Sequence, residues 1–350
     1  MKFSTFLDTL VDPTKKGKFY LTTQYELEEP APVEDEDDGP GLDPVLPSPT
    51  HKLKNDFPLH PRVLGNLVLQ QCNLWVGSSQ EPKSSGLHHD FHDNLYMLLS
   101  GYKRFVLFPP SAYPFLHIRG EIADVHPNGL LVYGEAGCVR PDGLHELDAA
   151  HWRLAARAQR LAPQTKRARN EKNNDAFTAY KKARDELTTL RQRYNTNEEE
   201  QDEDEDDGPP LFDGASEAGS NFSATDGEDL LASLGETPPE EPPSFSHIMP
   251  HTLHTHFGIA PAIPEPEEAN KGVKPETNCP RPLIVELKPG QMLYLPASWF
   301  HEVTSSSSGE NPHMALNYWM HPPDGIASTY ADNEIWDHIR CRVERETDNS

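Results

Sequence analysis

Two residues of metal-binding type, His88 and Asp90, stand two positions apart in a segment with the pattern of a β-strand. Side chains alternate between the two faces of a strand, so residues i and i+2 share a face. A neutral imidazole and a carboxylate therefore converge on one point. A third ligand must come from elsewhere in the chain, and His301, within the sequence PGQMLYLPASWFHEV, is the best candidate.

Two histidines and one carboxylate on one face of an iron ion leave three adjacent coordination positions open. Oxygen and a cosubstrate that chelates through two atoms need such positions. The spacing therefore predicts an Fe(II) site built from His88, Asp90 and His301. The alternative is that His88 is a hydrogen-bonded core residue and Asp90 a turn residue, because His-x-Asp alone often occurs by chance.

Neighbouring His89 and His92 are rival ligands by residue type. His89 should point to the opposite face of the strand, because it lies between the two proposed ligands. His92 follows the expected end of the strand. Neither is predicted to bind the iron.

Lys103 begins the strand that follows an expected hairpin at Gly101-Tyr102. A buried ammonium group near an iron site needs an anionic partner. The distal carboxylate of 2-oxoglutarate would provide one. Without the metal motif, the simpler reading of Lys103 is an exposed lysine in a hairpin.

The elements that position these residues are mostly short strands near the two ends of the chain. Periodicity and turn signals predict strands at Lys18–Thr23, Asn73–Gly77, Leu87–Asp90, Asn94–Ser100, Lys103–Phe108, Leu283–Leu287, Met292–Leu295, Trp299–Thr304 and Met314–Trp319. Helices are expected near the N-terminus, at 144–161, at 173–195 and at Glu334–Glu344. A long insert separates these two groups of strands. We therefore expect one all-β domain in which strands from both ends of the chain come together.

Four segments follow from this pattern. Residues 1–130 and 246–325 are predicted to form the two parts of the β domain, and 326–350 a terminal helix. Residues 131–245 form an insert that is first helical and then acidic and disordered, because its second part is rich in acidic residues, Ser, Gly and Pro. Its two helices should form a hairpin, with a basic cluster between them as a solvated turn or a nuclear-import patch: Lys166, Arg167, Arg169 and Lys172.

The charge of the chain is unevenly spread. The formal net charge is −25 over 350 residues, and the runs Glu34–Asp38 and Glu198–Asp207 hold much of it. The remainder lacks the basic stripe that phosphate binding needs, which argues against a nucleic-acid partner. No apolar stretch approaches the roughly 18 residues of a membrane span, so no membrane partner is expected.

Cysteine usage indicates the compartment. The four cysteines are scattered and form no CxxC pair, which argues against a zinc ribbon and favours a reducing environment. The N-terminus lacks the apolar region of a signal peptide. We therefore expect a cytoplasmic protein, a nuclear protein, or one that occurs in both places.

Three segments carry a family resemblance: SSGLHHDFHDNLYMLLSGYKRFVLFPP, PGQMLYLPASWFHEV and the tripeptide NYW at 317–319. They resemble the JmjC-domain and cupin-like (cupin_8) hydroxylases, which include the asparaginyl hydroxylase of hypoxia-inducible factor. The small JmjC lysyl hydroxylases are the most similar. The resemblance covers roughly residues 60–120 and 280–322, and it is weaker at 18–24. It implies a double-stranded β-helix, a jelly roll of the cupin type, with flanking helices.

The resemblance also implies residue roles. His88, Asp90 and His301 correspond to the iron ligands, and Lys103 to the lysine that pairs with the far carboxylate of 2-oxoglutarate. Further residues match positions that contact this cosubstrate or line its site: Tyr20, Ser85, Asn94, Asn317 and Trp319. The implied cofactor is Fe(II), and 2-oxoglutarate and O2 are consumed.

The implied activity is hydroxylation of a protein side chain, as in the lysyl hydroxylases, with release of succinate and CO2. One alternative is a JmjC demethylase acting on methyl-lysine in histones or other proteins, although nothing in the chain resembles its usual zinc modules. A tRNA hydroxylase is disfavoured by the acidic charge. A scaffold without iron, whose insert binds partners, is disfavoured by the intact triad and Lys103. A protein substrate is expected, and a homodimer is left open.

Overall fold

The computed structural model describes residues 3–12, 14–15, 19–23, 45–79, 81–134, 138–171, 178–179, 181–183, 185–186, 188–189, 241–260, 272–309 and 311–349. Both acidic runs lie outside these ranges. So do most of the second helix expected at 173–195 and the expected disordered stretch up to residue 240. Within the described part of the chain, no helix is long and apolar enough to cross a lipid bilayer.

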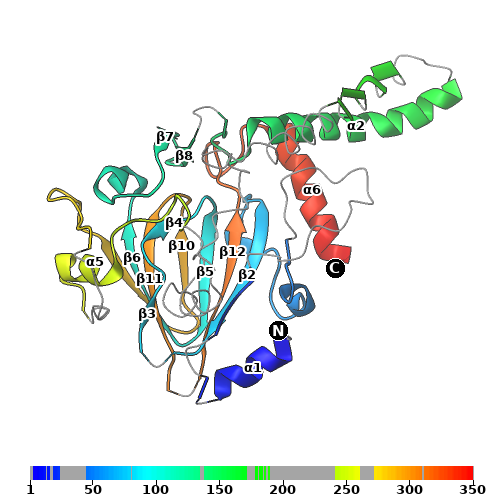
Figure 1. Cartoon of the computed structure of the whole chain (residues 1–350). Helices are drawn as coiled ribbons and strands as arrows, with labels where there is room; N and C mark the ends of the chain where they lie inside the picture. Colours follow the sequence, from blue (N-terminus) through cyan, green and yellow to red (C-terminus); the bar gives the residue numbers. More distant parts are fainter. Residues whose placement is uncertain are drawn as a thin grey trace, which may run out of the picture.

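One antiparallel sheet contains five strands in the order β1, β2, β12, β5, β10 (Figure 1). Their bounds are β1 Tyr20–Thr22, β2 Leu69–Gly77, β12 His313–Met320, β5 Asp93–Ser100 and β10 Met292–Leu295. Strand β2 pairs with β12 from Gly77↔His313 to Leu69↔Met320. Distant parts of the chain therefore close a single sheet, as the sequence predicted.

The second antiparallel sheet has the order β3, β11, β6, β9, and the short strand β4 also pairs with β11. The bounds are β3 Lys83–Ser84, β4 His88–His89, β6 Tyr102–Phe108, β9 Leu283–Leu287 and β11 Phe300–Ser306. The two sheets together form the cupin-type jelly roll that was expected. A smaller hairpin pairs β7, Ile122–Val125, with β8, Leu131–Tyr133.

Apolar side chains that alternate with other residues along the strands fill the space between the sheets. Tyr96 and Leu98 of β5 and Phe105 and Leu107 of β6 belong to one buried cluster. The period of two places these side chains on the inner face of each sheet. The same inner faces carry the functional side chains nearer the ends of the strands.

Helices lie around the two sheets (Figure 1). They are α1 Phe3–Val11, α2 Glu146–Glu171, α5 Pro250–Phe257 and α6 Asn333–Asn349, with short 3-10 turns at Thr50–Leu53, Arg62–Leu64 and Pro110–Phe115. Buried Trp152 of α2 and Trp336 of α6 share a cluster with Cys72 of β2. Leu253 of α5 packs with Val106 and Phe300 against the second sheet.

The first helix of the predicted insert differs from the prediction in length. Helix α2 runs to Glu171, whereas the sequence predicted an end at residue 161 and a turn at the basic cluster. Lys166, Arg167 and Arg169 therefore lie within a helix, and Lys172 lies outside the described residues. Good helix formers flank Pro163 on both sides, so the helix continues past a residue that usually ends one.

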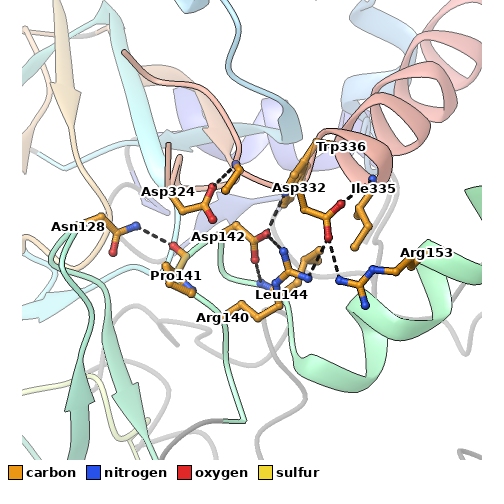
Figure 2. Close-up of polar contacts among 11 residues, drawn as sticks. Asn128, Arg140, Pro141, Asp142, Leu144, Arg153, Asp324, Asp332, Ile335 and Trp336 are labelled. Atoms are coloured by element: carbon orange, nitrogen blue, oxygen red, sulfur yellow. Dashed lines mark hydrogen bonds and ion pairs between the residues drawn. The ribbon is translucent and has the colours of Figure 1, made fainter. Parts of the chain in front are cut away.

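The start of this segment is tied to the C-terminal helix by a polar network (Figure 2). Arg140 donates to the buried carboxylate of Asp142 at 2.7 Å, and the Trp336 indole N–H donates to the same carboxylate at 2.9 Å. Arg153 of α2 reaches Asp332 at 2.8 Å. Burial raises the pKa of Asp142, while Arg140 favours the charged form. These contacts hold α2 and α6 together beside the first sheet.

Loss of the Asp142 carboxylate should destabilise this junction. We expect Asp142→Ala to lower the free energy of unfolding by about 3 kcal/mol, because Arg140 and the Trp336 N–H lose a buried partner. Urea denaturation measures the change. The control is Asp337→Ala, which removes a surface ion pair with Arg340 and should change stability little. Equal stability of the two variants would contradict this account of the junction.

Candidate metal centre

His88, Asp90 and His301 come together at one end of the space between the sheets. One ligand atom from each residue lies within 4.8 Å of the others. Pairing of β4 with β11 sets His88 opposite His301, and their ring centroids are 4.3 Å apart. The carboxylate of Asp90 lies 3.6 Å from His301 Nε2. That separation is longer than a good hydrogen bond, so the two groups do not satisfy each other.

The strand that carries His88 is shorter than predicted. It ends at His89, before Asp90, because the Asp90 carbonyl accepts a hydrogen bond from Ser298 N–H at 2.7 Å instead of continuing the ladder. Asp90 still reaches the common point. The predicted convergence of the three side chains is therefore present, and their role as iron ligands stays a prediction.

Both imidazoles are oriented by backbone carbonyl groups. His88 Nδ1 lies 3.1 Å from the Gly86 carbonyl oxygen, and His301 Nδ1 lies 2.9 Å from the Trp299 carbonyl oxygen. A carbonyl oxygen only accepts hydrogen bonds, so each Nδ1 must carry the proton. The lone pair of each Nε2 is then available to a metal, the arrangement that metal-binding histidines need.

The His88 ring is also held by an aromatic residue at the end of the predicted insert. Phe245 stacks on it with centroids 4.7 Å apart and an interplanar angle of 8°. The backbone around Phe245 bridges to His88, and Ser246 N–H donates to the Leu87 carbonyl at 2.8 Å. The chain therefore returns from the insert directly onto a predicted ligand.

Burial sets the protonation of the three side chains. It lowers the pKa of His88 well below its ordinary value, with a further contribution from His301. It raises the pKa of Asp90, while the nearby His301 opposes this rise. A neutral imidazole and a carboxylate whose charge is poorly solvated both favour binding a cation. The donor set, its orientation and its burial fit Fe(II).

The two rival histidines have other partners. His89 Nε2 lies 2.6 Å from the Tyr133 hydroxyl, and its ring packs against Phe300. His92 stacks on Trp319, with centroids 5.3 Å apart. His89 thus points away from the metal centre, as the alternation of side chains predicted.

Lys103 is buried in the interior rather than exposed in the hairpin. Its ammonium group donates to the Ser305 hydroxyl at 2.6 Å and lies 5.8 Å from the centroid of the Tyr20 ring. Burial lowers the pKa of Lys103 to about 7. An anion at this position would restore the charged form, so the surroundings of Lys103 suit a carboxylate.

A chain of hydrogen bonds joins three neighbouring strands of the first sheet, β2, β12 and β5. The Trp75 indole N–H donates to the side-chain Oδ1 of Asn317 at 2.9 Å, and the side-chain N–H of Asn317 donates to Asn94 Oδ1 at 3.0 Å. The side chains of Asn94 and Asn317 are therefore fixed in direction. Trp319 lies on the same face of β12 as Asn317, because the two residues are two positions apart.

The Ser85 hydroxyl is bonded to backbone groups. It donates to the Gly86 carbonyl at 2.9 Å and accepts from Val303 N–H at 3.0 Å. Both contacts are to the backbone, and they join the segment before His88 to strand β11. Ser85 thus supports the two strands that carry the histidines, and its contact with the cosubstrate stays a prediction.

Sequence reasoning missed three residues around the site: Phe245, Trp75 and Ser305. Phe245 is the last residue of the predicted insert, in a part expected to be disordered, but it is ordered and buried. Ser305 is the register partner of Lys103, and its alternation with His301 along β11 could have suggested an inward hydroxyl. Trp75 required knowledge of which strand pairs with β12.

Comparisons with known proteins show the family to which the chain belongs. A family model described as a cupin-like domain matches residues 1–325. JmjC domain-containing protein 4 of Schizosaccharomyces pombe is 40% identical over 339 residues, which are 93% of this chain and 71% of that protein. Two local matches each cover 20% of this chain.

One local match is the bifunctional peptidase and (3S)-lysyl hydroxylase JMJD7 of Homo sapiens, at 35% identity over 71 residues and 22% of that protein. The other is the lysine-specific demethylase JMJ31 of Arabidopsis thaliana, at 38% identity over 73 residues and 13% of that protein. The chain belongs to the cupin-like family of JmjC-domain proteins, whose members are typically Fe(II)- and 2-oxoglutarate-dependent oxygenases.

Proposed function

We propose that the protein is an Fe(II)- and 2-oxoglutarate-dependent oxygenase that hydroxylates a side chain of a protein substrate in the cytoplasm, the nucleus or both. The observation that carries the proposal is the pairing of two features in one interior. Three metal-binding atoms lie within 4.8 Å of one another, and the buried Lys103 lies along the same interior with a hydroxyl as its hydrogen-bond partner. An oxygenase of this class needs both features.

Different residues would bind the metal and the cosubstrate. His88, Asp90 and His301 would hold Fe(II) on one face, and Lys103 would hold the far carboxylate of 2-oxoglutarate. Bound Fe(II) would couple oxidative decarboxylation of 2-oxoglutarate, giving succinate and CO2, to insertion of one oxygen atom of O2 into a substrate C–H bond. The hydrogen-bonded Asn94 and Asn317 form a fixed polar wall, which limits the positions open to the cosubstrate.

Hydroxylation is preferred to demethylation because the small JmjC lysyl hydroxylases share the motifs that surround His88 and His301. The second candidate is a methyl-lysine demethylase, since a local relative bears that name. The two reactions differ in product mass. A hydroxylated substrate gains one oxygen atom, whereas a demethylated substrate loses a methyl group.

Mass spectrometry of proteins from cells with and without this chain tests the proposal. We expect peptides that carry one extra oxygen atom only when the active chain is present, together with succinate formed by the purified chain on those peptides. Loss of methyl groups instead would establish the demethylase. Absence of 2-oxoglutarate turnover with every candidate peptide would contradict both.

The affinity for 2-oxoglutarate should depend on pH through Lys103. Its pKa in the free protein is lowered to about 7, and a bound carboxylate should raise it again. Only the protonated amine attracts the ligand, so the dissociation constant should rise with pH, approaching tenfold per unit above about pH 7. Calorimetry between pH 7 and 9 measures this slope. A flat profile would contradict a titrating Lys103 contact.

A further inference from the structure

Tyr20, Gly77 and His313 form one row across three neighbouring strands of the first sheet. Tyr20 of β1 is the register partner of Gly77 of β2, and Gly77 is also the partner of His313 of β12. Side chains of register partners point to the same face of a sheet. Tyr20 and His313 therefore flank a residue that has no side chain.

The glycine lets the two rings meet. A Cβ atom at Gly77 would lie 2.6 Å from Tyr20 Cδ2 and 2.7 Å from His313 Cε1, which no real Cβ tolerates. The centroids of the Tyr20 and His313 rings are 5.8 Å apart. The rings thus close over Gly77 as a continuous aromatic wall.

This wall faces the Lys103 end of the interior. His313 shares a face of β12 with Asn317, because the two residues are four positions apart and side chains alternate. Lys103 and Ser305 are register partners on the second sheet, and Lys103 Nζ lies 5.8 Å from the Tyr20 ring centroid. Lysine, hydroxyl, phenol and imidazole groups from both sheets therefore surround one end of the interior.

One ring nitrogen of His313 makes no hydrogen bond to the described residues at this end of the interior. The side chain is 3% exposed, and its Nδ1 is buried without a hydrogen-bond partner among the described residues. Burial, with a smaller contribution from the Lys103 charge, lowers the pKa of His313 to about 3. The ring is therefore neutral, with one N–H donor. When that proton is on Nδ1, this atom is a buried donor without a partner, which is costly, and a ligand that accepts a hydrogen bond would relieve the cost.

We propose that His313 is a further binding residue for the far carboxylate of 2-oxoglutarate, and that its Nδ1–H donates a hydrogen bond to this carboxylate from the first sheet, whereas Lys103 binds it from the second. The inference rests on the proposed function and adds a residue that the sequence motifs did not indicate. It also makes His313 a specificity residue. An oxoacid that ends in a methyl group would leave the His313 N–H without an acceptor and the Lys103 ammonium without an anionic partner.

Two ligands of equal carbon-chain length test the proposal. 2-Oxoglutarate and 2-oxopentanoate share the chelating oxoacid end, and they differ in a carboxylate against a methyl group at the far end. Calorimetry on the full chain loaded with Mn(II), with oxygen excluded, measures the affinity for each. The variants are His313→Leu, which removes the donor, and His313→Gln, which keeps an N–H. The matched control is His321→Leu, which alters another buried histidine just beyond β12.

We expect His313→Leu to bind 2-oxoglutarate about ten- to hundredfold more weakly, the effect of losing one hydrogen bond to a charged group. Its affinity for 2-oxopentanoate should stay unchanged, and His313→Gln should recover part of the loss. The His321→Leu control should bind both ligands as the unaltered chain does.

Two results would overturn the role of His313. One is unchanged affinity of His313→Leu for 2-oxoglutarate, and the other is an equal loss for both ligands, which would indicate a structural role alone. If the unaltered chain itself binds no 2-oxoglutarate, the proposed function fails. That failure is distinguishable, because it does not involve the variants.

Discussion

Replacement of Asp90 by alanine should abolish turnover and leave the fold intact. Asp90 supplies the single carboxylate of the triad. Loss of a hydrogen-bonding partner of a metal ligand already costs roughly 10- to 100-fold in metal affinity or activity, and loss of a ligand should cost more. Because burial disfavours the charged form of Asp90, its removal should not weaken folding. Succinate formation and urea denaturation measure the two effects.

Two controls sharpen this prediction. Asp90→Asn keeps the size of the side chain and removes its charge, so it should be nearly as inactive as Asp90→Ala. Asp124→Ala alters an exposed carboxylate of β7 and should leave turnover unchanged. Turnover by Asp90→Ala at close to the normal rate would show that Asp90 holds no catalytic metal.

The second large effect should come from Lys103. We expect Lys103→Met to raise the KM for 2-oxoglutarate roughly hundredfold, because the far carboxylate loses a buried, charge-assisted partner. At saturating 2-oxoglutarate much of kcat should remain, since the metal ligands are untouched. Steady-state succinate assays at varied cosubstrate separate the two constants.

A measurement of stability distinguishes a lost contact with 2-oxoglutarate from unfolding of the Lys103→Met variant. Burial lowers the pKa of Lys103 to about 7, so the folded state disfavours the charged amine at neutral pH and folding is penalised by it. Methionine has a similar length and no charge, and Lys103→Met should therefore be as stable as the unaltered chain or more so. The exposed-site control is Lys288→Ala. An unchanged KM in Lys103→Met would refute the contact with the far carboxylate.

The strands that carry the site were predictable because their boundaries are marked locally. Leu283–Leu287 and Met292–Leu295 have the predicted bounds. Prolines stand just before the first and just after the second, and Pro289-Gly290 turns the chain between them with a φ of 85° at Gly290. Such residues stop a strand whatever its tertiary surroundings.

Other features depend on which strands become neighbours, and local patterns do not contain that information. The strand at His88 was predicted to include Asp90, but a hydrogen bond from Ser298, distant in sequence, ends it earlier. Phe245 ends the predicted insert, and its stacking on His88 depends on how the chain returns from the insert to the second sheet. His313 acquires its significance only when β2 and β12 pair and Gly77 leaves room for its ring.

Some site residues are likewise marked by the local sequence, whereas the contacts that orient them are not. His88, Asp90, His301 and Lys103 were found from residue type and spacing, because their chemistry demands specific side chains. The neighbours that orient them use backbone carbonyl groups, as at Gly86 and Trp299. Almost any residue supplies a carbonyl, so no sequence signal marks these contacts.

The most direct test of the central claim is an anaerobic calorimetric titration of the chain with 2-oxoglutarate, in the presence and absence of Fe(II). We expect one iron ion per chain, and 2-oxoglutarate binding that is strong only when the iron is present, because the ligand would be held both by the metal and by Lys103. In Asp90→Ala the iron-dependent part should vanish. Iron that does not bind, or 2-oxoglutarate that binds equally well without it, would contradict an iron site formed by His88, Asp90 and His301.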